Sequence, residues 1–187
     1  MTAAPDQLHF TGNDEADELI ARDPLALLIG FVLDQQVPLQ KAFSSPLELQ
    51  RRLGSLDAAE IAGMDPGELE RVFREKPALH RFPGNMARRV QELARTIVSE
   101  YDGRAGQVWE DAADGDDLRE RLAVLPGFGD MKVKALGAVL AKRFGVEAAQ
   151  PLVPHHPTLG DVDSPEALER YQEAKRAHKR AIKAESG

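Results

Sequence analysis

The sequence predicts an all-α protein, and three observations favour this class. Apolar residues recur at spacings of three and four along several segments, which is the pattern of one helix face. Asp or Ser followed by proline stands where several such segments begin, and glycine stands where others end. No segment alternates apolar and polar residues over the length of a strand. We therefore expect helices joined by short loops throughout.

The helices of the first half follow from their start signals and apolar spacing. Asp23 and Pro24 precede a run that is apolar on every face, which predicts a buried helix. The pair Ser45 and Pro46 predicts the start of the next helix. The buried helix is expected over residues 24–33, and further helices are expected over 57–62, 65–73 and 83–98.

The second half is predicted to contain a helical hairpin over residues 116–144. An amphipathic helix at 116–124 ends in a glycine-containing turn, and a second helix follows at 130–144. Residues 150–160 include three prolines and are expected to form an irregular loop. A last helix, over 164–183, begins at a Ser-Pro pair.

Composition limits the class of protein. The chain of 187 residues is long enough for one domain or for two small lobes that share a cleft. It has no cysteine, which excludes disulfides and thiolate-held zinc or iron–sulfur clusters. No apolar run approaches the roughly 18 residues of a membrane span, and the first residues lack the order of a signal peptide. We therefore expect a cytoplasmic protein without a metal or other cofactor.

The net charge of −7 is unusual for a protein that binds nucleic acid. The charges are segregated along the chain: acidic residues crowd 14–18 and 110–117, whereas Lys132 and Lys134 follow the hairpin turn. This pattern fits a basic face on an acidic protein, and it also fits an ordinary solvated surface. The last helix carries several basic residues, which suit either phosphate contacts or the negative end of the helix dipole.

The turn of the hairpin has a specific physical use. It consists of Leu125, Pro126, Gly127, Phe128 and Gly129. Its glycines let the backbone come close to a partner, and the first amides of the following helix suit a phosphate. Lys132 and Lys134 would add positive charge nearby. The alternative is a tight helix–helix turn in which Phe128 packs inward.

Residues 125–135, LPGFGDMKVKA, resemble the hairpin of the helix-hairpin-helix (HhH-GPD) superfamily of base excision repair DNA glycosylases. The apolar helix that ends in Gln35 and Gln36, and the segment 82–90, are similar to further family segments in the same order. The resemblance covers about residues 25–145. It implies a two-lobed helical fold, one globular unit over the whole chain, and a monomer that binds damaged duplex DNA.

The resemblance also implies roles for individual residues. The hairpin turn, together with Met131, Lys132 and Lys134, would bind the DNA backbone, and Gln36 would fill the gap left by a flipped base. The activity implied is that of a monofunctional DNA glycosylase, which hydrolyses the bond between a damaged base and its sugar. Met131 stands where members that cut the strand through a Schiff base have a lysine, which argues against a lyase.

One family residue is missing. An aspartate that stabilises the cationic sugar is expected near residues 149–152, where this chain has no acidic residue. Asp161 and Asp163 are weak candidates that the proline-rich loop would have to bring into the cleft, and both also suit an ordinary helix start. The gap supports an alternative function, a DNA lesion-binding or structure-binding protein without catalysis. The acidic net charge supports a third alternative, a helical interaction protein that binds no nucleic acid.

Other residues have two interpretations each. Asp34 precedes the glutamine pair and lies either near the expected base pocket or at a helix end as a cap. His155 and His156 suit a metal or a phosphate, but no third ligand is evident and an exposed loop is the simpler interpretation. Trp109 fits the core better than a platform for base stacking.

Overall fold

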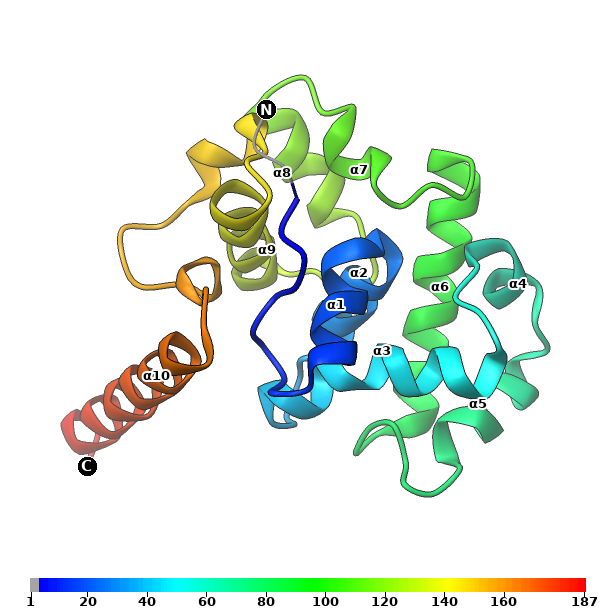
Figure 1. The fold of residues 1–187 in the computed structure, drawn as a ribbon, viewed down its shortest axis with the longest axis horizontal. Helices are drawn as coiled ribbons and strands as arrows, with labels where there is room; N and C mark the ends of the chain where they lie inside the picture. The colour runs from blue at the N-terminus through cyan, green and yellow to red at the C-terminus, as the bar shows by residue number, and fades with distance from the viewer. Residues whose placement is uncertain (1–3) are drawn as a thin grey trace.

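The computed structural model describes residues 4–187, and within these residues it contains helices and loops but no strand, which confirms the all-α class (Figure 1). The elements are α1 (Asp14–Arg22), α2 (Pro24–Leu33), α3 (Leu39–Leu53), α4 (Ala58–Gly63), α5 (Pro66–Arg74), α6 (Pro83–Tyr101), α7 (Gln107–Glu110), α8 (Gly115–Ala123), α9 (Asp130–Arg143), the 3-10 helices η1 (Glu147–Leu152) and η2 (Leu159–Asp161), and α10 (Pro165–Glu185). None of the helices in this described part is long and apolar enough to cross a membrane.

Helix α2 is the centre of the fold. Every residue from Leu25 to Leu33 is buried, as its uniformly apolar sequence predicts. The Asp23 carboxylate caps the helix by accepting from the amides of Leu25 and Ala26, and Pro24 occupies the first position. Helices α1, α3 and α6 pack around α2 (Figure 1). The position of α2 matters for function because its last turn reaches the hairpin.

The prediction that a helix begins at Ser45 and Pro46 is wrong, because α3 begins at Leu39 and Pro46 lies inside it. Packing of the first turns of α3 explains the difference. The Phe43 ring makes edge-on contacts with Phe10 and Phe31, each with 5.1 Å between ring centroids. This burial offsets the backbone hydrogen bond that proline cannot donate.

Helix α1 was not predicted, since its sequence was interpreted only as an acidic run. Its signal is Asn13, whose side chain accepts from the Ala16 amide as an N-cap, followed by acidic residues in the first turn. Asp17 of this run is buried, with 2% exposed. Its carboxylate accepts from the amides of Phe10 and Thr11 and so fixes the N-terminal segment to α1.

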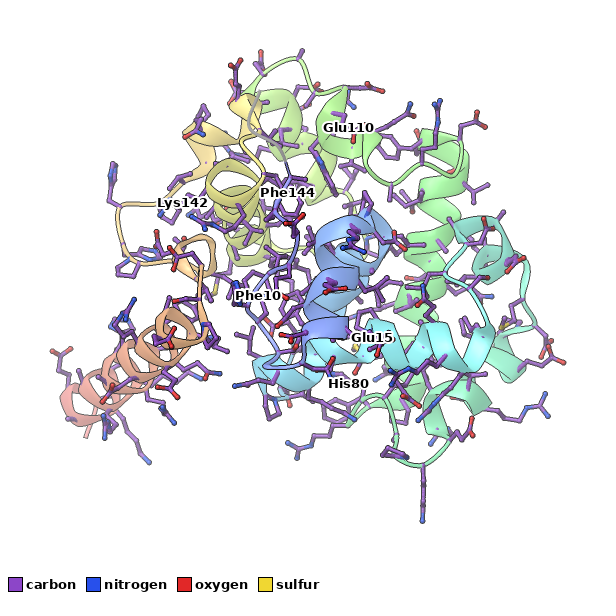
Figure 2. All side chains as sticks on the ribbon, in the orientation of Figure 1. Phe10, Glu15, His80, Glu110, Lys142 and Phe144 are labelled. Carbon is purple, nitrogen blue, oxygen red and sulfur yellow. The ribbon has the colours of Figure 1, made fainter. Side chains whose placement is uncertain are left out.

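The second lobe contains α8, α9 and the two 3-10 helices. The prediction of an irregular loop over 150–160 is wrong at both ends, because η1 and η2 occupy them and pack against α9. Small residues on α9 and η2 permit this approach. A Cβ added to Gly137 would lie 2.7 Å from Leu152, and one added to Gly160 would lie 2.5 Å from the Ala138 carbonyl oxygen. Lys142, labelled in Figure 2, pairs with Asp161 of η2 at 2.6 Å.

Helix α10 leaves the body of the protein (Figure 1). Ala167 and Leu168 in its first turn are buried, whereas every residue from 173 onward is exposed.

Candidate nucleic-acid interface

The turn between α8 and α9 has two buried apolar side chains and two exposed glycines. Leu125 and Phe128 are buried, and the Phe128 amide donates to the Leu125 carbonyl at 3.1 Å. Gly127 adopts a φ of +81°, a left-handed conformation that favours glycine. Gly127 and Gly129 are both exposed. Phe128 therefore packs inward, and this packing presents the backbone of the two glycines to solvent.

The first turn of α9 offers free amides. Its N-cap is Gly129, which has no side chain to accept from them. The first amide bonded within the helix is that of Val133, which donates to the Gly129 carbonyl at 3.0 Å. The amides of Asp130, Met131 and Lys132 have no acceptor among the described residues. This is the arrangement in which a helix N-terminus binds a phosphate oxygen.

The two lysines expected to add charge are both engaged. Lys134 pairs with Asp130 at 2.9 Å on the surface of α9. Lys132 points into the body, where its ammonium donates to the Val32 carbonyl at 3.2 Å. Burial lowers the pKa of Lys132, and the positive charge of Arg89 lowers it further against the opposing effect of Asp34. Met131, by contrast, is 86% exposed at the hairpin.

The turn between α2 and α3 lies beside the hairpin. Gln36 is exposed and has a φ of +58°, which is rare for a residue with a Cβ. Gln35 accepts from the Arg89 guanidinium at 2.6 Å, and the Arg89 side chain also passes within 3.6 Å of the Cβ position of Gly127. Arg89 thus links the glutamine turn to the hairpin turn.

His80 contacts the same turn through hydrogen bonds. It was not predicted from the sequence, because nothing in its local sequence marks it. It is buried, and Figure 2 labels it below α3. Its Nδ1 accepts from the Phe82 amide at 2.9 Å, so the proton of the neutral ring is on Nε2. That N–H faces the carbonyls of Leu33 and Gln35, each at 3.0 Å.

This geometry predicts a pH dependence of stability. Burial lowers the pKa of His80 below its ordinary value of 6.5, although the two carbonyls oppose the shift. The unfolded chain then binds a proton more readily than the folded protein, so the free energy of unfolding should fall as the pH drops below 6.5. Denaturant unfolding from about pH 5 to about pH 8 measures this. The slope should be smaller in His80→Gln, and an equal slope in both proteins would contradict the assignment.

Asp34 is a partly buried carboxylate that directly precedes Gln35 and Gln36. It is the C-cap of α2, and its side chain accepts no hydrogen bond from the described residues. Burial raises the pKa of Asp34, and the positive charges of Lys175 and Lys132 offset only part of that effect. Burial raises the pKa of Tyr171, and the negative charge of Asp34 raises it further. The charges that act on this carboxyl at the end of α2 therefore come from α9 and α10.

The remaining candidates lie elsewhere. The Asp161 carboxylate is bonded to Lys142 and to the Thr158 amide, as part of a capping box that begins η2. Asp163 is exposed just before α10. His155 and His156 are exposed, and the described residues contain no group of three metal-ligating side chains. Trp109 is 6% exposed, in the core as expected.

The family comparison agrees with this geometry. The family model described as HhH-GPD superfamily base excision DNA repair protein matches residues 29–186. The chain belongs to the HhH-GPD superfamily. The match includes the hairpin, the glutamine turn and α10, and membership implies a base excision repair protein that binds DNA. Comparisons with curated proteins and with solved structures give no match.

In this HhH-GPD protein the region of the missing aspartate packs against the second helix of the hairpin, with two of its four residues buried. Ala149 and Leu152 of η1 are buried against α8 and α9, and Gln150 donates to the Ala141 carbonyl at 3.4 Å. Residues 149–152 therefore bring no carboxylate to the hairpin. Any carboxylate that acts beside the hairpin must come from another element.

Gln36 gives a test that separates folding from binding. Gln36→Gly removes the left-handed strain of a residue with a Cβ, so the free energy of unfolding should stay the same or rise by up to about 1 kcal/mol. The side chain expected to occupy a vacated base position is lost at the same time, so affinity for duplex with an abasic site should fall. Denaturant unfolding and titration of labelled duplex measure the two effects. Equal affinity of variant and parent would remove the gap-filling role from Gln36.

Proposed function

We propose that this HhH-GPD protein is a monofunctional DNA glycosylase that acts on damaged duplex DNA as a monomer. The observation that carries the proposal is the hairpin, whose exposed glycines and unbonded α9 amides suit one DNA phosphate. With the phosphate held there, the glutamine turn faces the same stretch of DNA, since Arg89 links the two turns. Gln36 would then enter the stack as the damaged base leaves it.

We further propose Asp34 as the carboxylate of the reaction, in preference to Asp161 and Asp163. The carboxylate of Asp161 is already bonded to Lys142 and Thr158. Asp34 has free oxygens in a partly buried place beside the hairpin, where a negative charge stabilises a cationic sugar more strongly than it would in water.

The reaction proposed is a simple hydrolysis. The bond between the sugar C1′ and the base nitrogen breaks, and its electron pair leaves with the base. A water oxygen bonds to C1′ and transfers a proton to the Asp34 carboxylate. The thioether of Met131 cannot form a Schiff base, and the Lys132 ammonium donates to the Val32 carbonyl. The products are therefore a free base and an intact strand with an abasic site.

The test is a panel of duplexes that each contain one damaged base, incubated with the protein and then treated with alkali. We expect alkali-dependent cleavage at one class of lesion and no cleavage before alkali. Cleavage without alkali would contradict the monofunctional assignment. Base loss at the background rate for every lesion would contradict the glycosylase.

The second candidate function is a DNA lesion-binding or structure-binding protein without catalysis. The observation that favours it is the absence of a carboxylate from residues 149–152. It predicts tight, hairpin-dependent binding of abasic or mismatched duplex with no base release from any member of the panel. Binding and release measured on the same duplexes distinguish the two functions.

A further inference from the structure

Helix α10 is exposed over most of its length and packs against the rest of the protein only at its first turns. Its root is fixed by Ala167 and Leu168, which are buried, and by Gln172, which exchanges hydrogen bonds with Gln40 at 3.0 and 3.1 Å. Beyond Gln172 its side chains point into solvent on all sides (Figure 2). Residues 173–185 thus form a rod about 20 Å long at the usual rise of an α-helix.

The charge on this rod is one-sided. Residues 174–184 contain no acidic residue, and their basic residues are Lys175, Arg176, Lys179, Arg180 and Lys183, here called the basic stripe. At about 100° per residue, all five directions fall within an arc of about 140°. Helix α10 has six basic and four acidic residues, a net charge of +2, so the rest of the chain carries −9. Positive charge is therefore concentrated on an element that the fold does not need to bury.

The opposite side of the rod is poorly suited to a protein or membrane partner. It presents small residues, at Ala174, Ala177, Ala181 and Ala184, and the one large apolar side chain of the rod is Ile182, 52% exposed. Coiled coils and membrane-surface helices need large apolar residues along a whole face. A polyanion needs only the charges that the stripe offers.

The root of the stripe lies beside the segment that the hairpin also contacts. Lys132 of the hairpin helix bonds to Val32 at 3.2 Å, at the end of α2. Lys175 lies 5.9 Å over the Tyr171 ring, and its charge acts on Asp34 two residues further along the same segment. The hairpin and the root of the stripe therefore both lie near the end of α2.

We propose that the basic stripe of α10 binds the phosphate backbone of the same DNA duplex, outside the stretch held by the hairpin. The inference rests on the proposed function only in that the protein binds duplex DNA, and it does not require catalysis. It makes α10 a second, sequence-independent contact that lengthens the DNA site.

The test compares two triple variants with the same change in charge. The first is Arg176→Gln, Lys179→Gln and Arg180→Gln, which leaves Lys175 and its contact with Tyr171 intact. The control is Arg71→Gln, Lys76→Gln and Arg95→Gln, three exposed residues on α5, on the loop after it and on α6. Affinity for undamaged duplex is measured across salt concentrations, together with the length of the protected DNA. Circular dichroism checks that α10 remains helical.

Each phosphate contact contributes about 0.9 to the slope of log affinity against log salt. The α10 variant should lose about 2 to 3 from this slope, and its footprint should shorten, whereas the control should lose less than about 1. Equal slopes in the two variants would overturn the role of α10 but not the proposed function. Charge-dependent binding of α10 to anionic phospholipid vesicles with an unchanged DNA slope would do the same. No DNA affinity in the unmodified protein would overturn the proposed function as well.

Discussion

Gly129→Ala should weaken DNA binding by about 10-fold to 100-fold and leave the fold intact. The backbone of Gly129 has ordinary extended angles, and an added Cβ would meet no atom within 4 Å. The free energy of unfolding should therefore change by at most about 1 kcal/mol, the difference between glycine and alanine as an N-cap. In the complex, the methyl group would occupy the space of the phosphate and weaken a charge-assisted hydrogen bond to an α9 amide, a loss of about 1.5–3 kcal/mol.

The matched control is Gly63→Ala. Gly63 is an exposed glycine at the end of α4, and a Cβ added there would also meet nothing within 4 Å. Titration of labelled duplex should give the control the affinity of the unmodified protein. If Gly129→Ala bound as tightly as Gly63→Ala, the turn between α8 and α9 would not be the phosphate site.

Asp34→Asn should reduce base release by about 100-fold or more while making the protein more stable. The rate falls because an amide neither holds a proton from water nor opposes the charge of a cationic sugar. Stability rises because burial raises the pKa of Asp34, which means that the ionised carboxylate is unfavourable in the folded state. Single-turnover base release and denaturant unfolding at neutral pH measure the two effects.

The sign of the pH effect follows from the same shift. Between the ordinary pKa of 3.8 and the raised value, the folded protein binds a proton at Asp34 that the unfolded chain has lost. The contribution of Asp34 to stability therefore decreases as the pH rises through that range. The difference in unfolding free energy between Asp34→Asn and the unmodified protein should grow in favour of the variant over the same range.

Asp161→Asn is the contrasting variant. It weakens the pair with Lys142 and the bond to the Thr158 amide, so it should lower stability and leave single-turnover base release unchanged. Reduced release in Asp161→Asn with normal release in Asp34→Asn would move the carboxylate role from α2 to η2.

The sequence was sufficient where local signals and burial agree. Helix α2 is predicted because a cap, a first-position proline and an unbroken apolar run all indicate one buried helix. The hairpin is predicted for a similar reason, since Gly127 needs the left-handed conformation and Phe128 needs burial within one short turn. Both features depend on residues that are close together in the chain.

The limits of the sequence appear where packing competes with a local rule. A Ser-Pro pair ordinarily starts a helix, but the Phe43 contacts with Phe10 and Phe31 extend α3 in the N-terminal direction past Pro46. Likewise, Lys132 suits a phosphate contact by position alone, yet its ammonium bonds to a carbonyl 100 residues away in the chain. The helix propensity of a short segment contributes less to the free energy of folding than burial of side chains and hydrogen bonds between distant segments.

The sequence by itself determined an all-helical chain with a glycine-containing turn between two helices, and it showed that residues 149–152 lack an acid. Only the tertiary structure decided what surrounds that hairpin. Arg89 reaches Gln35 across 54 residues, His80 reaches Leu33 across 47, and the pKa of Asp34 responds to positive charges on α9 and α10. These interactions depend on how separate helices pack, because a side chain acquires its partners, and a carboxyl its pKa, only when distant segments are brought together.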